Sequence, residues 1–158
     1  MASSSISFLL YHIIFSVKQR QYWIMEDCEP RVHAYIAGII KHIGGKPIIV
    51  GGQRDHIHIL SLLPRHVSLS EVMKLIKGKS AHWYNQELEG VRPKLIWQEG
   101  YDAISVSPDN LEKVKNYILH QAMHHSNMPF AAEREMMASR MVVSGASTEK
   151  SEEPEGSD

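Results

Sequence analysis

Two histidines flank Ile57 in a short apolar run. The segment His56–Leu63 alternates apolar side chains with the histidines and then stays apolar, which predicts a β-strand leaving a glycine-rich turn. Side chains two residues apart on a strand share a face, so both imidazoles should project together while Ile57 points into the core. Such a pair supplies two ligands of a small metal site. Because the chain has ten histidines, a partly exposed strand pair is the alternative.

A second set of polar side chains follows much later in the chain. Tyr117, Gln121 and His124 stand at positions i, i+4 and i+7 of a predicted helix, so they share one helix face. We expect this face to be polar and to lie opposite the buried side marked by Val114 and Ile118. A surface tyrosine with a glutamine one turn away is common, so the spacing alone leaves a structural role open.

The clearest basic patch lies between these two sets, on a helix that opens with the capping box Ser68–Glu71. It is formed by Lys74, Lys77 and Lys79. A run of this kind is most often a solvated helix face, and the alternative is a surface that binds phosphate groups. Charge alone leaves both interpretations open.

The composition is that of one globular domain with a real core. The 158 residues are 43% apolar and 22% charged. A single cysteine, Cys28, excludes an internal disulfide framework and suits a reducing cytosol. No apolar run reaches the roughly 18 residues of a membrane span. The residues before Tyr11 lack the positive start of a signal peptide, and we expect a strand there.

The net charge of −1 hides an uneven distribution. Residues 139–158 hold five acids and two bases, which leaves 15 bases and 13 acids in residues 1–138, a net charge of +2. A mildly basic body permits a nucleic-acid partner without requiring one. We expect residues 1–143 to form the folded domain and residues 144–158, rich in Ser, Glu and Gly, to be an acidic disordered tail.

Hydrophobic periodicity and helix caps predict the order strand, helix, strand, strand, helix, strand, with further helices after it. This is the ferredoxin-like pattern, an α+β fold with helices on one face of an antiparallel sheet. The histidine pair lies on the third strand and the tyrosine on the helix after the fourth. The predicted strands span residues 7–17, 46–50, 56–63 and 95–106, the last with a kink at Gly100, and a turn covers residues 51–55. One helix covers residues 26–43, a second begins at residue 68, and two more cover residues 109–125 and 130–141.

Three motifs in this order carry a family resemblance. They are His56-Ile57-His58 after a glycine-rich turn, then Trp97-Gln98-Glu99-Gly100-Tyr101, then Tyr117-Ile118-x-x-Gln121-x-x-His124-His125. Together they closely resemble the single-tyrosine HUH transposases, which belong to small insertion sequences that move as single-stranded DNA. The segments Tyr11–Arg20 and Leu75–Ser80 are similar to the family as well, so the resemblance covers residues 7 to 130, nearly all of the expected fold.

The resemblance implies a metal-dependent tyrosine transposase. His56, His58 and Gln121 match the family's ligands for Mg²⁺ or Mn²⁺, and Tyr117 matches its nucleophile. Enzymes of the family are homodimers whose tyrosine helices can be exchanged between subunits, and they recognise single-stranded DNA hairpins near the ends of their element. The implied compartment is the cytoplasm of a bacterial or archaeal cell, with the enzyme at the nucleoid when it is bound to DNA.

These residue types suit phosphodiester cleavage. A phenol has a pKa near 10 and is a poor nucleophile at neutral pH, whereas a divalent cation offsets charge on the phosphate oxygens. Attack by Tyr117 would give a 5′-phosphotyrosine and a free 3′-hydroxyl, and the covalent link would let strands rejoin without ATP. The side chains expected to hold backbone phosphates are Lys18, Arg20, Lys74, Lys77 and Lys79.

Several alternatives stay open. His124 is an accessory candidate, for proton transfer or DNA contact, and a zinc site built from His56, His58 and His124 is chemically feasible. A non-catalytic single-strand binding module on the same frame would not need the tyrosine, the glutamine and both histidines together. A domesticated relative with the same chemistry and a host function would have the same residues.

Overall fold

The computed structural model describes residues 5–21, 23–87, 90, 94–121 and 130–140. The chain divides into two compact units, with the boundary between Ser126 and Asn127. Among the described residues, the first unit contains the sheet and three α-helices, and the second contains one helix, α4 (Phe130–Arg140). The expected boundary between domain and tail, at residues 143 and 144, lies outside the described residues.

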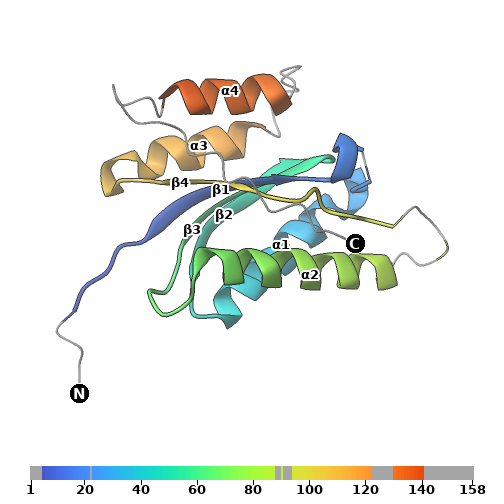
Figure 1. Ribbon diagram of the computed structural model, residues 1–158, viewed down its shortest axis with the longest axis horizontal. Coiled ribbons are helices and arrows are strands. Elements are labelled where there is room, and N and C mark those ends of the chain that lie inside the picture. Colours follow the sequence, from blue (N-terminus) through green and yellow to red (C-terminus); the bar gives the residue numbers. More distant parts are fainter. Residues whose placement is uncertain (1–4, 22, 88–89, 91–93, 122–129, 141–158) are drawn as a thin grey trace, which may run out of the picture. The chain divides into compact units, whose positions relative to one another are not determined.

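The sheet has four antiparallel strands in the order β2-β3-β1-β4. Their bounds are β1 Leu10–Ser16, β2 Lys46–Gln53, β3 His56–Leu62 and β4 Asp102–Ser105. The predicted α+β, ferredoxin-like fold is confirmed (Figure 1). Strand β3, which carries the histidine pair, is central and pairs with both β1 and β2.

Two long helices connect the strands, α1 (Glu29–His42) and α2 (Leu69–Glu87). Pro30 stands in the first turn of α1, where its missing N–H costs nothing. The predicted cap of α2 is present, because the Glu71 amide donates a hydrogen bond to Ser68 Oγ over 3.2 Å. A third helix, α3 (Leu111–Gln121), follows β4 and a single 3-10 turn.

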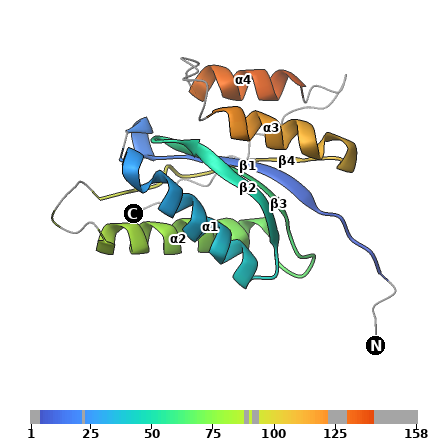
Figure 2. The same cartoon turned by 180° about the vertical axis from the view of Figure 1, so that it is seen from behind.

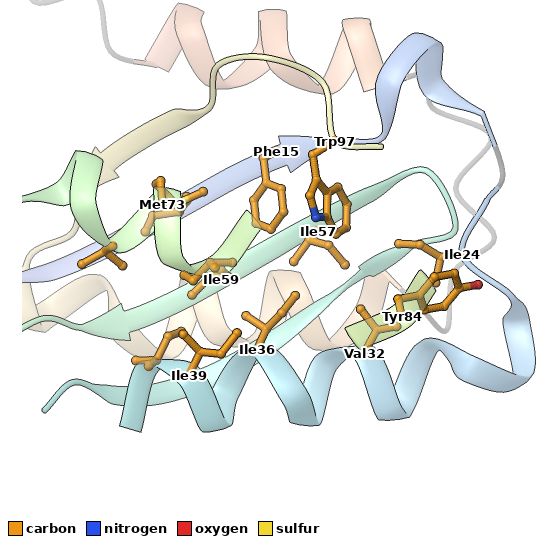
Figure 3. Packing of buried hydrophobic residues seen from close by; sticks show 14 of the residues in the cluster. Phe15, Ile24, Val32, Ile36, Ile39, Ile57, Ile59, Met73, Tyr84 and Trp97 are labelled. Carbon is orange, nitrogen blue, oxygen red and sulfur yellow. The ribbon is translucent and has the colours of Figure 1, made fainter. Parts of the chain in front are cut away.

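The two faces of the sheet are covered by different helices (Figures 1 and 2). One face packs against α1 and α2 in the large core, where Phe15 and Ile57 from the strands meet Ile36 of α1 (Figure 3). The other face carries α3, through a smaller cluster of Leu10, Leu60 and Ile118. Period-two alternation along β1 and β3 therefore separates an apolar face from a face that also holds histidines.

The hairpin that leads into β3 is tighter than the sequence indicates. Residues 51–55 were expected to form the turn, but the ladder continues to the pair Gln53–His56, so the turn is Arg54 and Asp55 alone. Gly52 makes this geometry accessible, since its φ is +128° and a Cβ there would lie 2.3 Å from the His56 carbonyl oxygen. The expectation of a long glycine turn is thus wrong, because the glycines are strand residues.

The fourth strand is shorter than the expected span of residues 95–106. Trp97 forms only an isolated bridge with Val17, and β4 begins after Gly100, whose φ is +83°. A left-handed residue interrupts the extended backbone, so the segment divides into two parts rather than bending as one strand. None of the described helices is long and apolar enough to cross a membrane.

Candidate active site

His56 and His58 lie on one face of β3, as predicted. Both rings are buried, with 3% and 0% of their surface exposed, and their ligand nitrogens lie within 4.8 Å of each other. Ile57 between them is fully buried in the core on the opposite face. The strand therefore holds two converging imidazoles in an environment from which solvent is excluded.

Each of the two rings has its Nδ1 atom engaged. His56 Nδ1 donates to Asp55 Oδ1 over 2.7 Å, and His58 Nδ1 shares a hydrogen bond with His12 Nε2 over 2.8 Å. The Nε2 atoms of both rings are buried. An imidazole whose Nδ1–H is donated to a neighbour presents its other nitrogen as the metal ligand. The donor set therefore fits a divalent cation bound through the two Nε2 atoms.

Helix α3 brings Tyr117 beside this pair. The tyrosine ring is half-buried, with its centroid 6.1 Å from that of His58 and 6.4 Å from that of His12, in edge-on orientations. The expectation that Tyr117 lies opposite the side marked by Val114 and Ile118 is wrong. The tyrosine packs with the same small apolar cluster as they do, because neighbouring positions on a helix are only about 100° apart.

A glycine of β2 permits the close approach of α3. Gly51 pairs with His58, and a Cβ built on Gly51 would lie 2.8 Å from Ile118 Cγ2 and 3.5 Å from the Ile118 carbonyl oxygen. A Cβ at this position would force Ile118, or the helix that carries it, to shift. Gly51 thus allows α3 to pack closely over the histidine strand.

Two other expected site residues are Gln121 and His124. Gln121 is the last residue of α3, one turn beyond Tyr117, and its side chain lies outside the described set. His124 lies outside the described residues altogether. The proposed ligand set of His56, His58 and Gln121 and the zinc alternative with His124 stay predictions.

Comparison with known proteins identifies the class of enzyme to which this constellation belongs. A family model described as "Transposase IS200 like" matches residues 5–121, a span that includes every described residue of the site. The chain belongs to the IS200-like transposase family. It is therefore a DNA-processing enzyme, and the buried histidine pair is its candidate metal centre.

Individual relatives agree with the family model. The transposase for insertion sequence element IS200 of Salmonella typhimurium strain LT2 is 27% identical over 115 residues, covering 70% of this chain and 75% of the relative. The ISDra2 transposase TnpA of Deinococcus radiodurans strain R1 is 24% identical over 114 residues, covering 70% of this chain and 81% of the relative.

Solved structures share the fold at lower sequence identity. A candidate transposase from Deinococcus radiodurans R1 superposes with a TM-score of 0.60 at 18% identity, over 77% of this chain and 96% of the other. A REP-associated tyrosine transposase bound to a REP hairpin gives a TM-score of 0.58 at 12% identity, over 80% of this chain and 75% of the other. These likenesses confirm the fold of the transposase.

The expected basic residues of the transposase fall into two groups. Lys18 and Arg20 lie in a 3-10 turn after β1, and Lys74 and Lys79 lie on α2, and all four are exposed. Lys77 differs from them, because it is only partly exposed and its ammonium group is engaged with backbone.

Lys77 ties down the segment between Trp97 and β4. Its Nζ donates to the carbonyl oxygens of Gln98 over 2.8 Å and Gly100 over 2.5 Å. Burial lowers the pKa of Lys77, while the nearby carboxylate of Glu99 acts in the opposite direction. Lys77 therefore fixes a loop.

This loop also supports the basic turn after β1. The Lys18 amide donates to the Ile96 carbonyl over 2.8 Å, and the Gln19 amide donates to Gln98 Oε1 over 3.3 Å. Just before this turn, the Val17 amide donates to the Asp55 carbonyl over 2.7 Å. The exposed Lys18 and Arg20 therefore stand at the end of the sheet where the histidine strand begins.

Sequence reasoning missed three contributors to the site. Asp55 adjoins the histidine motif and could have been found from that position alone. His12 lies in a segment that carried the family resemblance, but only the pairing register of β1 with β3 brings it to His58. Gly51 was interpreted as a turn residue, and its role appears only once α3 is seen above it.

Proposed function

We propose that this transposase cleaves and rejoins single-stranded DNA at insertion-sequence ends through a 5′-phosphotyrosine intermediate. The observation that supports this most is the Tyr117 ring packed edge-on beside His58, which is one of two buried histidines on β3 whose Nδ1 atoms are engaged. Tyr117 is the proposed nucleophile.

The divalent ion, Mg²⁺ or Mn²⁺, would be held by His56 and His58 through Nε2, with Gln121 as the third protein ligand. Bound there, it would offset charge on the non-bridging phosphate oxygens. Because burial excludes water, that stabilisation would be stronger than at the surface. Solvent exclusion also protects the covalent intermediate from hydrolysis.

The chemical step uses the chain's own tyrosine. The Tyr117 oxygen loses its proton and forms a bond to phosphorus, while the bond from phosphorus to the 3′-oxygen breaks and that oxygen takes up a proton. The DNA is left with a 3′-hydroxyl and a 5′-end joined to the protein. Attack by another 3′-hydroxyl on the phosphotyrosine reverses the step and joins two strands.

DNA binding is assigned to exposed basic side chains of the turn after β1 and of helix α2. Lys18, Arg20, Lys74 and Lys79 would contact backbone phosphates, and Lys77 would act mainly by holding the loop after Trp97. The hairpin bound by a structural relative supports a hairpin near the element's end as the partner. We further propose a homodimer, with the tyrosine helices exchanged between subunits in one state, acting in the cytoplasm.

The test uses labelled single strands from the DNA that flanks the gene. They are mixed with protein and Mg²⁺ or Mn²⁺ and run on a denaturing protein gel. We expect the label to move with the protein, and to be lost with chelator and in Tyr117→Phe. Native-gel binding without any covalent shift would contradict the enzyme proposal and favour a binding module.

A further inference from the structure

We propose that His12 is a positioning residue that orients His58 toward the metal. It would do so by accepting the proton of His58 Nδ1, which leaves Nε2 as the ligand. This inference rests on the proposed metal-dependent function. Within the described part of the chain, His12 is hydrogen-bonded to Nδ1 of His58, just as Asp55 is hydrogen-bonded to Nδ1 of His56.

The sheet register places His12 for this task. His58 pairs with Ile14 and His12 pairs with Leu60, so the two histidines are diagonal neighbours on one face of adjacent strands. Their rings are nearly parallel, with an interplanar angle of 28° and centroids 5.1 Å apart. Only 5% of His12 is exposed. Both rings are held by central strands, so the 2.8 Å contact does not depend on a loop.

The chemistry of the contact fixes one arrangement of protons. A ring nitrogen that binds a metal must present its lone pair, so His58 must carry its proton on Nδ1. The neighbour 2.8 Å away must then offer an acceptor, which requires His12 to present the lone pair of Nε2 and carry its own proton on Nδ1. His12 thereby selects the ligating tautomer of His58.

The two proposed metal ligands have different hydrogen-bond partners. His56 donates to the carboxylate of Asp55, whereas His58 is hydrogen-bonded to the neutral ring of His12, which also lies edge-on to Tyr117. A partner that accepts from the second nitrogen fixes the orientation of a ligating ring, and its loss typically lowers metal affinity about 10- to 100-fold. His12 would thus align the ligand and flank the nucleophile at once.

The competing explanation is that His12 only fills space in the core. Two substitutions separate the two roles. His12→Phe keeps a ring of similar size but removes the acceptor, and His12→Gln restores an acceptor oxygen without the ring. Ile13→Val is the matched control, because Ile13 is the next residue of the same strand and faces the opposite core.

The measurement is Mn²⁺ binding to the full chain by isothermal titration, with circular dichroism to confirm folding. We expect His12→Phe to weaken binding by about 10- to 100-fold. Binding by His12→Gln should stay within a few-fold of wild type, and Ile13→Val should not change it. If His12→Phe binds like wild type while His58→Ala has lost binding, the inference is overturned and the metal site stands.

A second readout needs no variant. The ¹⁵N chemical shifts of the His58 ring in the Mg²⁺-loaded wild type should indicate a proton on Nδ1 and none on Nε2. A proton on Nε2 would overturn the inference even if His12→Phe failed to fold. If the wild type binds no Mn²⁺ at all, the metal-dependent proposal fails, and this inference fails with it.

Discussion

The two faces of the sheet do different work. The face covered by α1 and α2 is lined by fully buried apolar side chains such as Ile13, Ile57 and Ile59. The face under α3 has a smaller apolar cluster and buries three histidines, His12 among them. Burying a polar group destabilises the folded state unless the group is hydrogen-bonded. Apolar packing on the first face must therefore supply most of the free energy that stabilises the fold.

The sharpest test of this division uses two consecutive residues of β3. Ile57→Ala deletes a fully buried side chain from the large core and should cost about 2–5 kcal/mol of unfolding free energy. His56→Ala should reduce metal-dependent cleavage by roughly 10²–10³-fold, because a ligand is lost, while the chain stays folded. Denaturant unfolding and the covalent-capture gel measure the two effects.

The comparison fails if the pattern is reversed. An insoluble or unfolded His56→Ala variant would make that ring a core element rather than a ligand. A folded Ile57→Ala variant with lost cleavage and full stability would mean that the apolar face controls chemistry directly.

Two glycines extend the comparison to backbone spacing. Gly51→Ala would place a methyl group 2.8 Å from Ile118 Cγ2, which displaces α3 and moves Tyr117. We expect a loss of cleavage approaching about 10²-fold, as for a misplaced reacting group, with a stability cost of roughly 1–3 kcal/mol from overpacking. Adding Ile118→Ala removes the obstructing methyl, so the double variant should lose less stability than the sum of the single variants.

Gly38→Ala is the matched control on the other face. Gly38 lies inside α1, and a Cβ there would meet nothing within 4 Å. Alanine is favoured over glycine inside a helix by about 0.5–1 kcal/mol, so this variant should be slightly more stable and fully active. Unchanged cleavage in Gly51→Ala would show that the height of α3 does not matter.

The sequence was sufficient for the frame and the motifs, and insufficient for the contacts between strands. Alternation along β3 predicted correctly that both histidines share a face and that Ile57 enters the core, because a strand has a fixed period of two. The partner of His58 depends on the register between β1 and β3, which no local pattern specifies. The late start of the fourth strand likewise depends on a left-handed Gly100, whose carbonyl oxygen accepts a hydrogen bond from Lys77.

A histidine on α1, His33, adds a pH dependence of its own. Burial on α1 lowers the pKa of His33 from 6.5 to about 4, and its Nε2 has no hydrogen-bond partner among the described residues. Between pH 6.5 and pH 4, His33 is protonated in the unfolded chain but stays neutral in the folded chain. The free energy of unfolding therefore falls as the pH drops from 6.5 toward 4. The loss approaches about 3 kcal/mol.

His33→Leu should flatten this dependence without affecting cleavage. Chemical denaturation at pH 7 and pH 4.5 measures the difference between the two proteins, which cancels the titration of groups that both share. An equal loss of stability in wild type and variant would show that His33 does not carry the effect.

The smallest expected effects concern DNA binding by Lys77 and Lys79, which the sequence analysis placed in the same basic patch. Lys79 is exposed, and Lys79→Ala should weaken hairpin binding a few-fold and reduce the salt slope of log K by about one. Lys77→Ala removes the hydrogen bonds to Gln98 and Gly100, so it should loosen that loop. Because the Lys77 ammonium is engaged with backbone, its loss should change the salt slope less than the loss of Lys79 does. Binding titrations at several salt concentrations measure both slopes, and equal slopes in the two variants would return Lys77 to the phosphate-contacting group.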